Sequence, residues 1–249
     1  MVHFRQLSLR TLWSDTLNET LRSILSSRSV SSEDGIAHSL HSSISQEEGN
    51  FLQEIIRTAR PQVSLEVGCA YGISSLFICE ALRKVNARKH IIIDPNQHSA
   101  WKGIGLANLR RAGYADLIDF HEALSYQYLS HLTEERATID FAFIDGMHTF
   151  DYVLVDFFLV DKLLKPGGIV VLDDLLYPSI RSVCRYVLSN LRYTCVDPQS
   201  RELVPVIFLP ASLPNPPDHP NYAALQKLEQ DRIGEGHDAT RHWTDHKPF

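Results

Sequence analysis

The residues best suited to chemistry are acids and glycines that directly follow apolar, β-branched segments. Glu66 belongs to the apolar segment of residues 63–67, Gly68 follows it, and Gly72 comes four residues later. Asp94 ends a second apolar segment, 22 residues after Gly72. A buried strand, a glycine turn and a helix N-terminus form the place where α/β proteins hold nucleotide-like ligands. We therefore predict a ligand site at this turn.

The spacing of the glycines indicates the kind of nucleotide. A dinucleotide site uses Gly-x-Gly-x-x-Gly, whose middle glycine lets a pyrophosphate approach the backbone. Cys69 and Ala70 stand where that middle glycine would fall, so the turn suits a ligand without phosphates better than NAD. Asp94 could accept hydrogen bonds from ribose hydroxyls and would repel a 2′-phosphate. For either segment alone, a buried strand with a solvated acid at its tip is an equal alternative.

A second set of acids follows two later apolar segments. Asp145 comes after residues 139–144, and Asp173 and Asp174 come after residues 169–172. If these segments are neighbouring parallel strands, the carboxylates converge on one edge of the sheet and repel one another unless a proton or cation lies between them. Mg²⁺ or another hard divalent cation would resolve this and could orient a substrate hydroxyl. The alternative is that these acids only solvate the edge or cap a helix.

His148 is the leading candidate for a general base. It follows Asp145 by three residues, and the ordinary histidine pKa of about 6.5 suits proton removal near neutrality. Two alternatives stay open: His148 has a structural role, or Asp145 is both cation ligand and base.

The surrounding sequence predicts the elements that position these residues. Residues 1–59 read as an N-terminal helical cap, in which Ser45 and Glu48 form a capping box that opens a helix. Across residues 60–210, strand and helix patterns alternate, as a parallel sheet built from βαβ units requires. We therefore predict one α/β domain with a doubly wound sheet and terminal elaborations.

The C-terminal part has a different composition. Residues 192–196 and 204–209 read as a closing pair of strands. Five prolines then fall within eleven residues, so residues 211–249 are expected to form an extended arm with a short helix over residues 222–230. This arm or the N-terminal helices could join two copies of the chain in a homo-oligomer.

Composition limits the classes of function. The net charge of −6 argues against a nucleic-acid surface, which would need a basic stripe. We see no apolar stretch of the ~20 residues that span a bilayer and no signal-peptide core at the N-terminus. The four cysteines lack paired Cys-x-x-Cys spacing, which favours reduced thiols over disulfides or zinc. We expect a cytoplasmic enzyme without nucleic-acid or membrane partners.

Five segments together resemble the class I S-adenosylmethionine-dependent methyltransferases, and most of all the small-molecule O-methyltransferases of the catechol and macrolide-sugar type. The matching segments are residues 65–72, 93–95, 108–113, 141–148 and 163–174. The resemblance implies a Rossmann-like, mostly parallel seven-stranded sheet with one antiparallel edge strand. It also implies S-adenosylmethionine as the cofactor and Mg²⁺ or another divalent cation as a bound metal.

The resemblance further implies roles for individual residues. It gives cofactor contacts to Glu66, Gly68, Tyr71, Gly72, Asp94, Ser125, Tyr126 and Asp145. Among these, Asp94 would bind the ribose hydroxyls, and Ser125 and Tyr126 would contact the adenine. The metal ligands would be Asp145, Asp173 and Asp174. Position 174 is often Asn in the catechol type and Asp in the sugar-methylating type.

The predicted function is transfer of a methyl group from S-adenosylmethionine to a hydroxyl of a small molecule, with a divalent cation orienting that hydroxyl. Alternatives are metal-independent methylation of a nitrogen or carboxylate, a hydroxylase on the same scaffold, or a catalytically silent domain whose arm binds a partner. The methyl acceptor matches no sequence pattern. An aromatic-lined pocket would suit a phenol or polyketide, and a polar one would suit a sugar.

Overall fold

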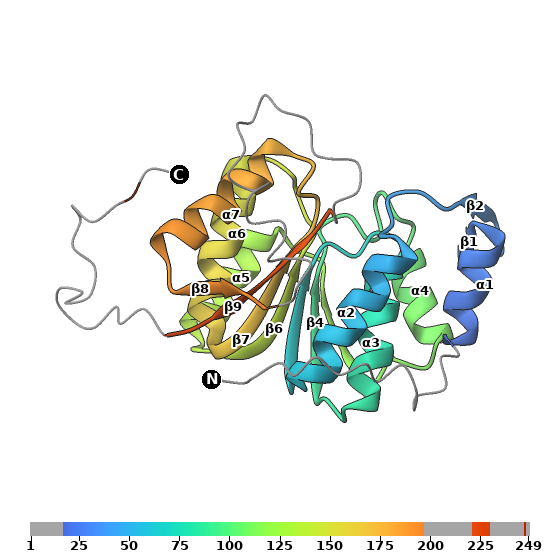
Figure 1. Ribbon diagram of the computed structural model, residues 1–249. Helices are drawn as coiled ribbons and strands as arrows, with labels where there is room; N and C mark the ends of the chain where they lie inside the picture. The colour runs from blue at the N-terminus through green and yellow to red at the C-terminus, as the bar shows by residue number, and fades with distance from the viewer. Residues whose placement is uncertain (1–16, 197–220, 230–246, 248–249) are drawn as a thin grey trace.

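The computed structural model describes residues 17–196, 221–229 and 247, and its centre is a seven-stranded sheet (Figure 1). The strands are β3 (Val63–Val67), β4 (Lys89–Ile93), β5 (Ile118–His121), β6 (Ile139–Ile144), β7 (Leu164–Leu172), β8 (Tyr193–Cys195) and β9 (Ala223–Lys227). Their order is β5-β4-β3-β6-β7-β9-β8, and β9 is antiparallel to both of its neighbours. This confirms the predicted mostly parallel sheet, although the antiparallel strand lies one place inside the edge.

Helices cover both faces of the sheet, as a doubly wound fold requires (Figure 1). One face carries α1 (Glu19–Ser27), α2 (Gln46–Ala59), α3 (Ile73–Lys84) and α4 (Ile104–Arg111). The other carries α5 (Ser125–Glu134), α6 (Phe150–Leu163) and α7 (Pro178–Asn190). None of the helices within the described ranges combines the length and apolar character needed to cross a membrane.

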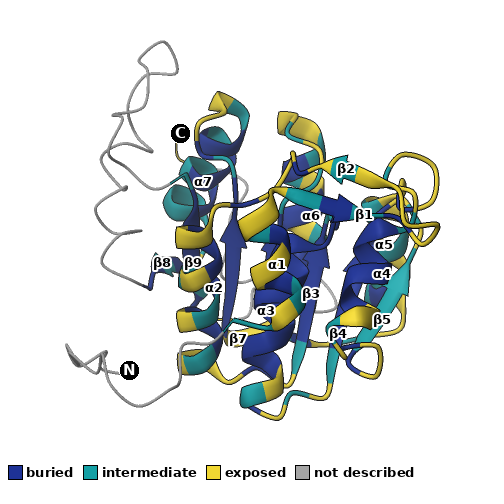
Figure 2. Cartoon of the chain, turned by 90° about the vertical axis from the view of Figure 1, so that its right-hand side faces the viewer, coloured by how far each residue is buried: buried dark blue, intermediate teal, exposed yellow. Residues whose placement is uncertain are grey.

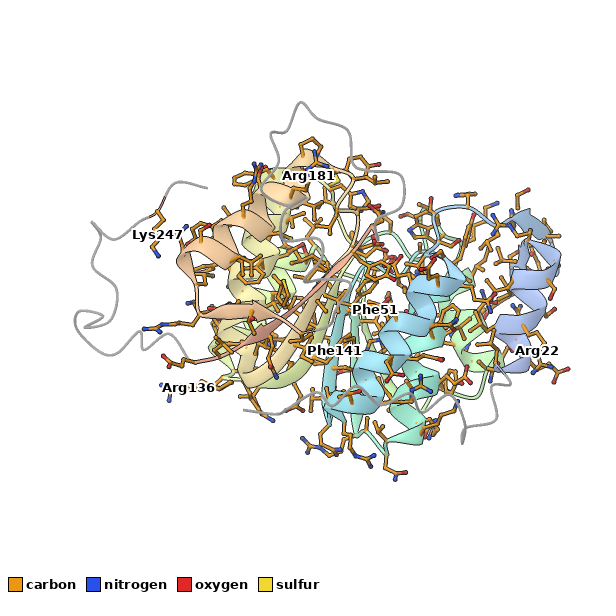
Figure 3. The ribbon with its side chains drawn as sticks, in the orientation of Figure 1. Arg22, Phe51, Arg136, Phe141, Arg181 and Lys247 are labelled. Atoms are coloured by element: carbon orange, nitrogen blue, oxygen red, sulfur yellow. The ribbon has the colours of Figure 1, made fainter. Side chains whose placement is uncertain are left out.

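The central strands are apolar throughout because both of their faces are buried. In β6, Phe141 and Phe143 pack into the core beneath α2 and α3, whereas Ala142 and Ile144 pack into the core beneath α6 and α7. Phe51 of α2 packs against the same core as Phe141, and both are labelled in Figure 3. The strands appear as a buried layer between partly exposed helices in Figure 2.

The C-terminal strand overturns one prediction. The sequence predicts a short helix over residues 222–230, but Ala223–Lys227 form β9 between β7 and β8. The first three residues of β9 are fully buried, and buried Lys227 places its Nζ 3.0 Å from the Asp161 carboxylate. Burial between two strands overrides the helix propensity of this segment. The sheet thus includes residues beyond 210, while the expected strand 204–209 lies outside the described residues.

The N-terminal part combines helices with a small hairpin. Helix α1 is followed by β1 (Ser29–Ser31), which pairs with β2 (Ala37–Ser39), and then by α2. Ser45 caps α2 as predicted, because its hydroxyl accepts a hydrogen bond from the Glu48 backbone N–H at 3.1 Å.

The functional edge of the sheet follows from the strand order. β3, β6 and β7 are parallel neighbours, so their carboxyl ends meet at one edge. Gly68, Asp145 and Asp173 each come directly after one of these strands. The predicted neighbour relation of β6 and β7 is therefore confirmed.

Candidate active site

The turn after β3 is shaped by its close approach to the end of β6. Gly68 has a φ of +94°, and a Cβ on it would lie 2.0 Å from the carbonyl oxygen of Asp145. Any side chain at Gly68 would therefore force the backbone to move. Gly72 has a φ of +77° and directly precedes α3, so the turn ends at a helix N-terminus as predicted.

Three side chains from later in the sequence hold this turn in place. The carboxylate of Asp94 accepts hydrogen bonds from the backbone N–H groups of Cys69 and Ala70 at 3.0 and 2.9 Å. Gln97 and Asn108 are buried and donate to carbonyl oxygens of the same turn at 2.9 and 3.0 Å. Neither was predicted from the sequence, and the only signal was that Asn108 lies in a segment that carries the family resemblance.

A cavity of about 290 Å³ opens beside this turn. Four of the residues predicted to bind the cofactor line it, namely Gly68, Asp94, Ser125 and Asp145. The other four, Glu66, Tyr71, Gly72 and Tyr126, do not. Unpredicted wall residues include Ile44, Asn96, Trp101, Leu124, Met147 and Tyr152. An apolar and aromatic wall with a few polar groups is typical of a small-molecule site.

The carboxylate of Glu66 lies beneath the turn and not in the cavity wall. Glu66 is fully buried and accepts hydrogen bonds from the hydroxyls of Ser74 and Ser75 at 2.5 and 2.6 Å. It also accepts one from Nε2 of His90 at 2.9 Å. Since the serines lie in α3 and the histidine in β4, Glu66 ties the start of the helix to the sheet.

The two predicted tyrosines support aromatic residues of the cavity wall. The hydroxyl of Tyr71 lies 3.0 Å from Nε2 of His41, and its ring packs edge-on against Trp101 with 5.1 Å between centroids. Tyr126 is exposed and packs edge-on against Tyr152 at 6.2 Å. Trp101 and Tyr152 line the cavity, so Tyr71 and Tyr126 contact the residues of the cavity wall without lining the cavity themselves.

The second predicted group converges at the carboxyl ends of β6 and β7; we call Asp145, His148, Asp173 and Asp174 the acid centre. Ligand atoms of Asp145, His148 and Asp174 all lie within 4.8 Å of one another. Nε2 of His148 is 3.3 Å from the Asp145 carboxylate and 3.0 Å from that of Asp174. Asp174 joins this group because its φ of +59° turns the chain immediately after β7.

Asp173 belongs to the same edge but faces the N-terminal helix α2. Asp173 is 6% exposed and Glu48 of α2 is 4% exposed, and a hydrogen bond joins their carboxyl groups. Asp173 also accepts a hydrogen bond from the backbone N–H of Asp174 at 2.6 Å. The sequence predicted Glu48 as a helix-capping residue, and nothing in it indicated that the side chain is buried beside the acid centre.

Comparison with known proteins agrees with this geometry. Residues 65–175 match a family model described as a methyltransferase domain. Caffeoyl-CoA O-methyltransferase from Petroselinum crispum is 30% identical over 136 residues, which cover 53% of this chain and 54% of that protein. Catechol O-methyltransferase from Bos taurus is 24% identical over 156 residues, covering 61% of this chain and 55% of that protein. The chain thus spans about half the length of these curated relatives.

Solved structures share the fold at low sequence identity. An O-methyltransferase from Bacillus cereus in complex with SAH has a TM-score of 0.59 at 17% identity, covering 88% of this chain and 94% of that one. TomG from Streptomyces achromogenes, in complex with SAM, has a TM-score of 0.60 at 17% identity, covering 89% and 93%. Residues 65–175 therefore resemble a methyltransferase domain, and the described fold is the one that these solved structures share.

The acid centre has few positively charged groups near its carboxylates. Burial raises the pKa of Asp145 to about 6, and the neighbouring Asp174 adds to the rise. Burial also raises the pKa of Asp173 well above its ordinary value. The pKa of His148 is raised by its hydrogen bond to Asp145. No lysine or arginine within the described ranges forms an ion pair with these acids, so each remaining negative charge is destabilised by the others.

This donor set fits a hard divalent cation. Carboxylate oxygens are the ligands that Mg²⁺ and similar ions prefer. A bound cation would offset the mutual repulsion of these carboxylates, which burial strengthens. Because Asp145 borders the cavity, a cation at this group would lie beside it.

Proposed function

We propose that this protein is a methyltransferase that transfers a methyl group from S-adenosylmethionine to a hydroxyl of a small aromatic molecule, beside a bound divalent cation. The observation that carries this proposal is the position of Asp145. It lines the cavity and also belongs to the acid centre. A methyl donor in the cavity would therefore lie next to the group that holds the acceptor oxygen, as in-line transfer requires.

The cavity offers groups that complement an adenosyl ligand. The carboxylate of Asp94 lines the cavity and is an acceptor for ribose hydroxyls, in addition to holding the turn. Ser125 lines the cavity and is hydrogen-bonded to the buried carboxyl of Asp156. When Asp156 is ionised, Ser125 must donate to it, which leaves lone pairs of Ser125 for the amino group of adenine.

The acid centre offers a group to take the proton of the acceptor. His148 holds its Nε2 between two carboxylates, and the resulting rise in its pKa makes it a stronger base. Asp145 is the alternative base. A cation held by Asp145, Asp173 and Asp174 would orient the acceptor hydroxyl and lower its pKa.

The surface around the acid centre favours an aromatic acceptor over a sugar. Met147, Leu176 and Tyr177 are large apolar residues that are 58%, 58% and 48% exposed. The ring of Tyr177 stacks on that of His148 with 5.1 Å between centroids. A flat phenolic ring would cover this exposed apolar area, whereas a sugar would leave it without a partner. The names of the relatives, for caffeoyl-CoA and catechol, support the same choice.

Calorimetry and turnover together test this function. S-adenosylmethionine is titrated into the purified protein with Mg²⁺ and with EDTA, and methyl transfer to a panel of catechols and a panel of sugars is then measured. We expect cofactor binding under both conditions and methylation of catechols only with Mg²⁺. Absence of cofactor binding would exclude the methyltransferase function. Full turnover in EDTA would favour the metal-independent alternative, and transfer to sugars alone would refute the aromatic acceptor.

Two substitutions separate the roles of the acids. Asp94→Ala removes the proposed ribose acceptor and should weaken S-adenosylmethionine binding by about tenfold or more, as the loss of charge-assisted hydrogen bonds implies. Asp173→Ala lies outside the cavity wall, so it should leave cofactor affinity unchanged and abolish turnover. Equal losses of cofactor affinity in the two variants would contradict this division of roles.

A further inference from the structure

Glu48 presents an unusual carboxylate beside the acid centre. It belongs to the first turn of α2, outside the domain of residues 65–175 that the family model matches. Its side chain is 4% exposed, and within the described part of the chain its Oε1 atom has no hydrogen-bond partner. A buried acceptor without a partner destabilises a fold, so its presence needs a physical reason.

The position of Glu48 is fixed by close packing of two helices. Gly49, the next residue, lies so close to α3 that a Cβ on it would come within 2.4 Å of the Phe77 ring. Helix α2 therefore lies flush against α3, side by side in Figure 1, and Glu48 is held at the edge of the sheet. This packing places the α2 backbone where the Glu48 side chain reaches Asp173.

The charges around Glu48 all have the same sign. Asp173 is hydrogen-bonded to it, and Asp145 and Asp174 are close enough to repel it. Within the described ranges, no lysine, arginine or histidine forms an ion pair with Glu48. Burying a charge in this way costs several kcal/mol unless a positive charge compensates it. The proton in the hydrogen bond between Glu48 and Asp173 relieves part of this cost, and a cation between Glu48 and the acid centre would replace that proton and compensate the remaining charges.

We propose that Glu48 is a fourth carboxylate of the divalent cation site, supplied by α2 to the three aspartates of the acid centre. This inference rests on the proposed function, because it assumes that the acid centre holds a cation. The free Oε1 atom becomes a cation ligand, which gives it the partner it otherwise lacks. Binding of the cation and docking of α2 then support each other, because a carboxylate from the helix closes the site.

Metal titration of purified protein tests this directly, without cofactor or acceptor. Mn²⁺ is titrated by calorimetry into the wild type, Glu48→Gln, Asp173→Asn and the control Glu47→Gln. Glu47 precedes Glu48 in the same turn of α2 but is exposed, so its variant removes the same charge from the same helix end. We expect Glu48→Gln to weaken Mn²⁺ binding by about tenfold or more, as loss of a metal-site carboxylate does. Glu47→Gln should stay within about twofold of the wild type, as expected of an exposed charge.

Thermal unfolding in EDTA controls for the fold. Glu48→Gln should melt at or above the wild-type temperature, because it removes one of several repelling carboxylates and keeps the side-chain shape. In the wild type, hydrogen exchange of the backbone amides of residues 46–50 should slow when Mn²⁺ is added. This second measurement uses no variant and therefore does not depend on the folding of Glu48→Gln.

The possible results separate this inference from the proposed function. Wild-type Mn²⁺ affinity in Glu48→Gln, with loss of binding in Asp173→Asn, would overturn the role of Glu48. No Mn²⁺ binding by the wild type, or no change in exchange at residues 46–50, would overturn it as well. If the wild type binds Mn²⁺ through Glu48 but does not bind S-adenosylmethionine, the methyltransferase function fails and the cation site stands.

Discussion

Replacing Glu66 with glutamine tests whether this residue supports the cofactor site or contacts the cofactor. The resemblance to methyltransferases implies a cofactor contact, but the carboxylate lies beneath the turn and outside the cavity wall. It is fully buried and accepts three hydrogen bonds, from Ser74, Ser75 and His90. We expect Glu66→Gln to lower stability and to leave cofactor affinity nearly unchanged.

The magnitude follows from the three hydrogen bonds. Glutamine keeps the volume of Glu66 and one acceptor oxygen, but it loses the charge and turns an NH₂ group toward a donor. A hydrogen bond to a charged group contributes about 1.5–3 kcal/mol and a neutral one about 0.5–1.5 kcal/mol. With one bond lost or reversed and two weakened, the free energy of unfolding should fall by about 2–4 kcal/mol. For a chain of this length, that is a fall in Tm of roughly 5–15 °C.

Urea unfolding measures the change in stability, and calorimetry with S-adenosylmethionine measures the affinity. Ser75→Ala is the matched control, because it removes one donor and leaves the charged carboxylate with its other two partners. Its effect should be smaller, about 1–2 kcal/mol, and less than additive with Glu66→Gln because both act on the same hydrogen bond. The reasoning is refuted if Glu66→Gln unfolds like the wild type while cofactor affinity falls tenfold or more.

Two further substitutions, at Gly68 and Asp156, test the same site. Gly68→Ala should destabilise the fold by about 2 kcal/mol or more and abolish S-adenosylmethionine binding, since its Cβ would lie 2.0 Å from the Asp145 carbonyl oxygen; wild-type affinity in calorimetry would contradict this. Asp156→Asn should change the pH dependence of stability, because burial raises the pKa of Asp156 from 3.8 to about 6. The folded state holds the proton of Asp156 more tightly than the unfolded state. Protonation of Asp156 therefore contributes fully to the stability of the fold below a pH of about 3.8, and this contribution is lost as the pH rises through about 6. Between pH 4 and pH 8, the free energy of unfolding of the variant should rise by about 1–3 kcal/mol relative to that of the wild type, as measured by urea unfolding. The same pH dependence of stability in both proteins would contradict this prediction.

The cofactor side of the site could be predicted because its signals are local in the sequence. Gly68 and Gly72 both have positive φ, and the strand, turn and helix that surround them follow one another without interruption. Asp94 directly follows the next strand, and parallel pairing of β3 with β4 brings it back to the turn. What could not be predicted is which of these groups face the cavity, because that depends on side chains such as Gln97 that are fixed only by tertiary contacts.

The strand β9 shows why local propensity failed at the C-terminus. The segment Ala223–Lys227 carries good helix formers and no β-branched residue, so neither its composition nor its periodicity indicates a strand. Its conformation is set by the space between β7 and β8 and by the buried contact of Lys227 with Asp161. Both are distant in sequence.

The acid centre could be predicted from the sequence only in part. The sequence predicted that Asp145, Asp173 and Asp174 meet at one edge, and the order of β6 and β7 confirms the strand arrangement behind that prediction. Consecutive residues of a continuing strand point to opposite faces, so Asp173 and Asp174 could both serve the site only if the chain turns at once. The φ of +59° at Asp174 answers this, because the turn sends Asp174 to His148 and leaves Asp173 facing Glu48.

The charge balance of the acid centre gives the strongest argument for a cation. Three elements bring these carboxylates together: Asp145 follows β6, Asp173 and Asp174 follow β7, and Glu48 lies in the first turn of α2. Local sequence cannot supply the compensating charge, and within the described ranges His148 is the basic residue that reaches the group. One histidine cannot neutralise four carboxylates, so in the absence of metal the group must hold protons. A fold that gathers these acids from three elements is therefore poised to bind a divalent cation as those protons leave.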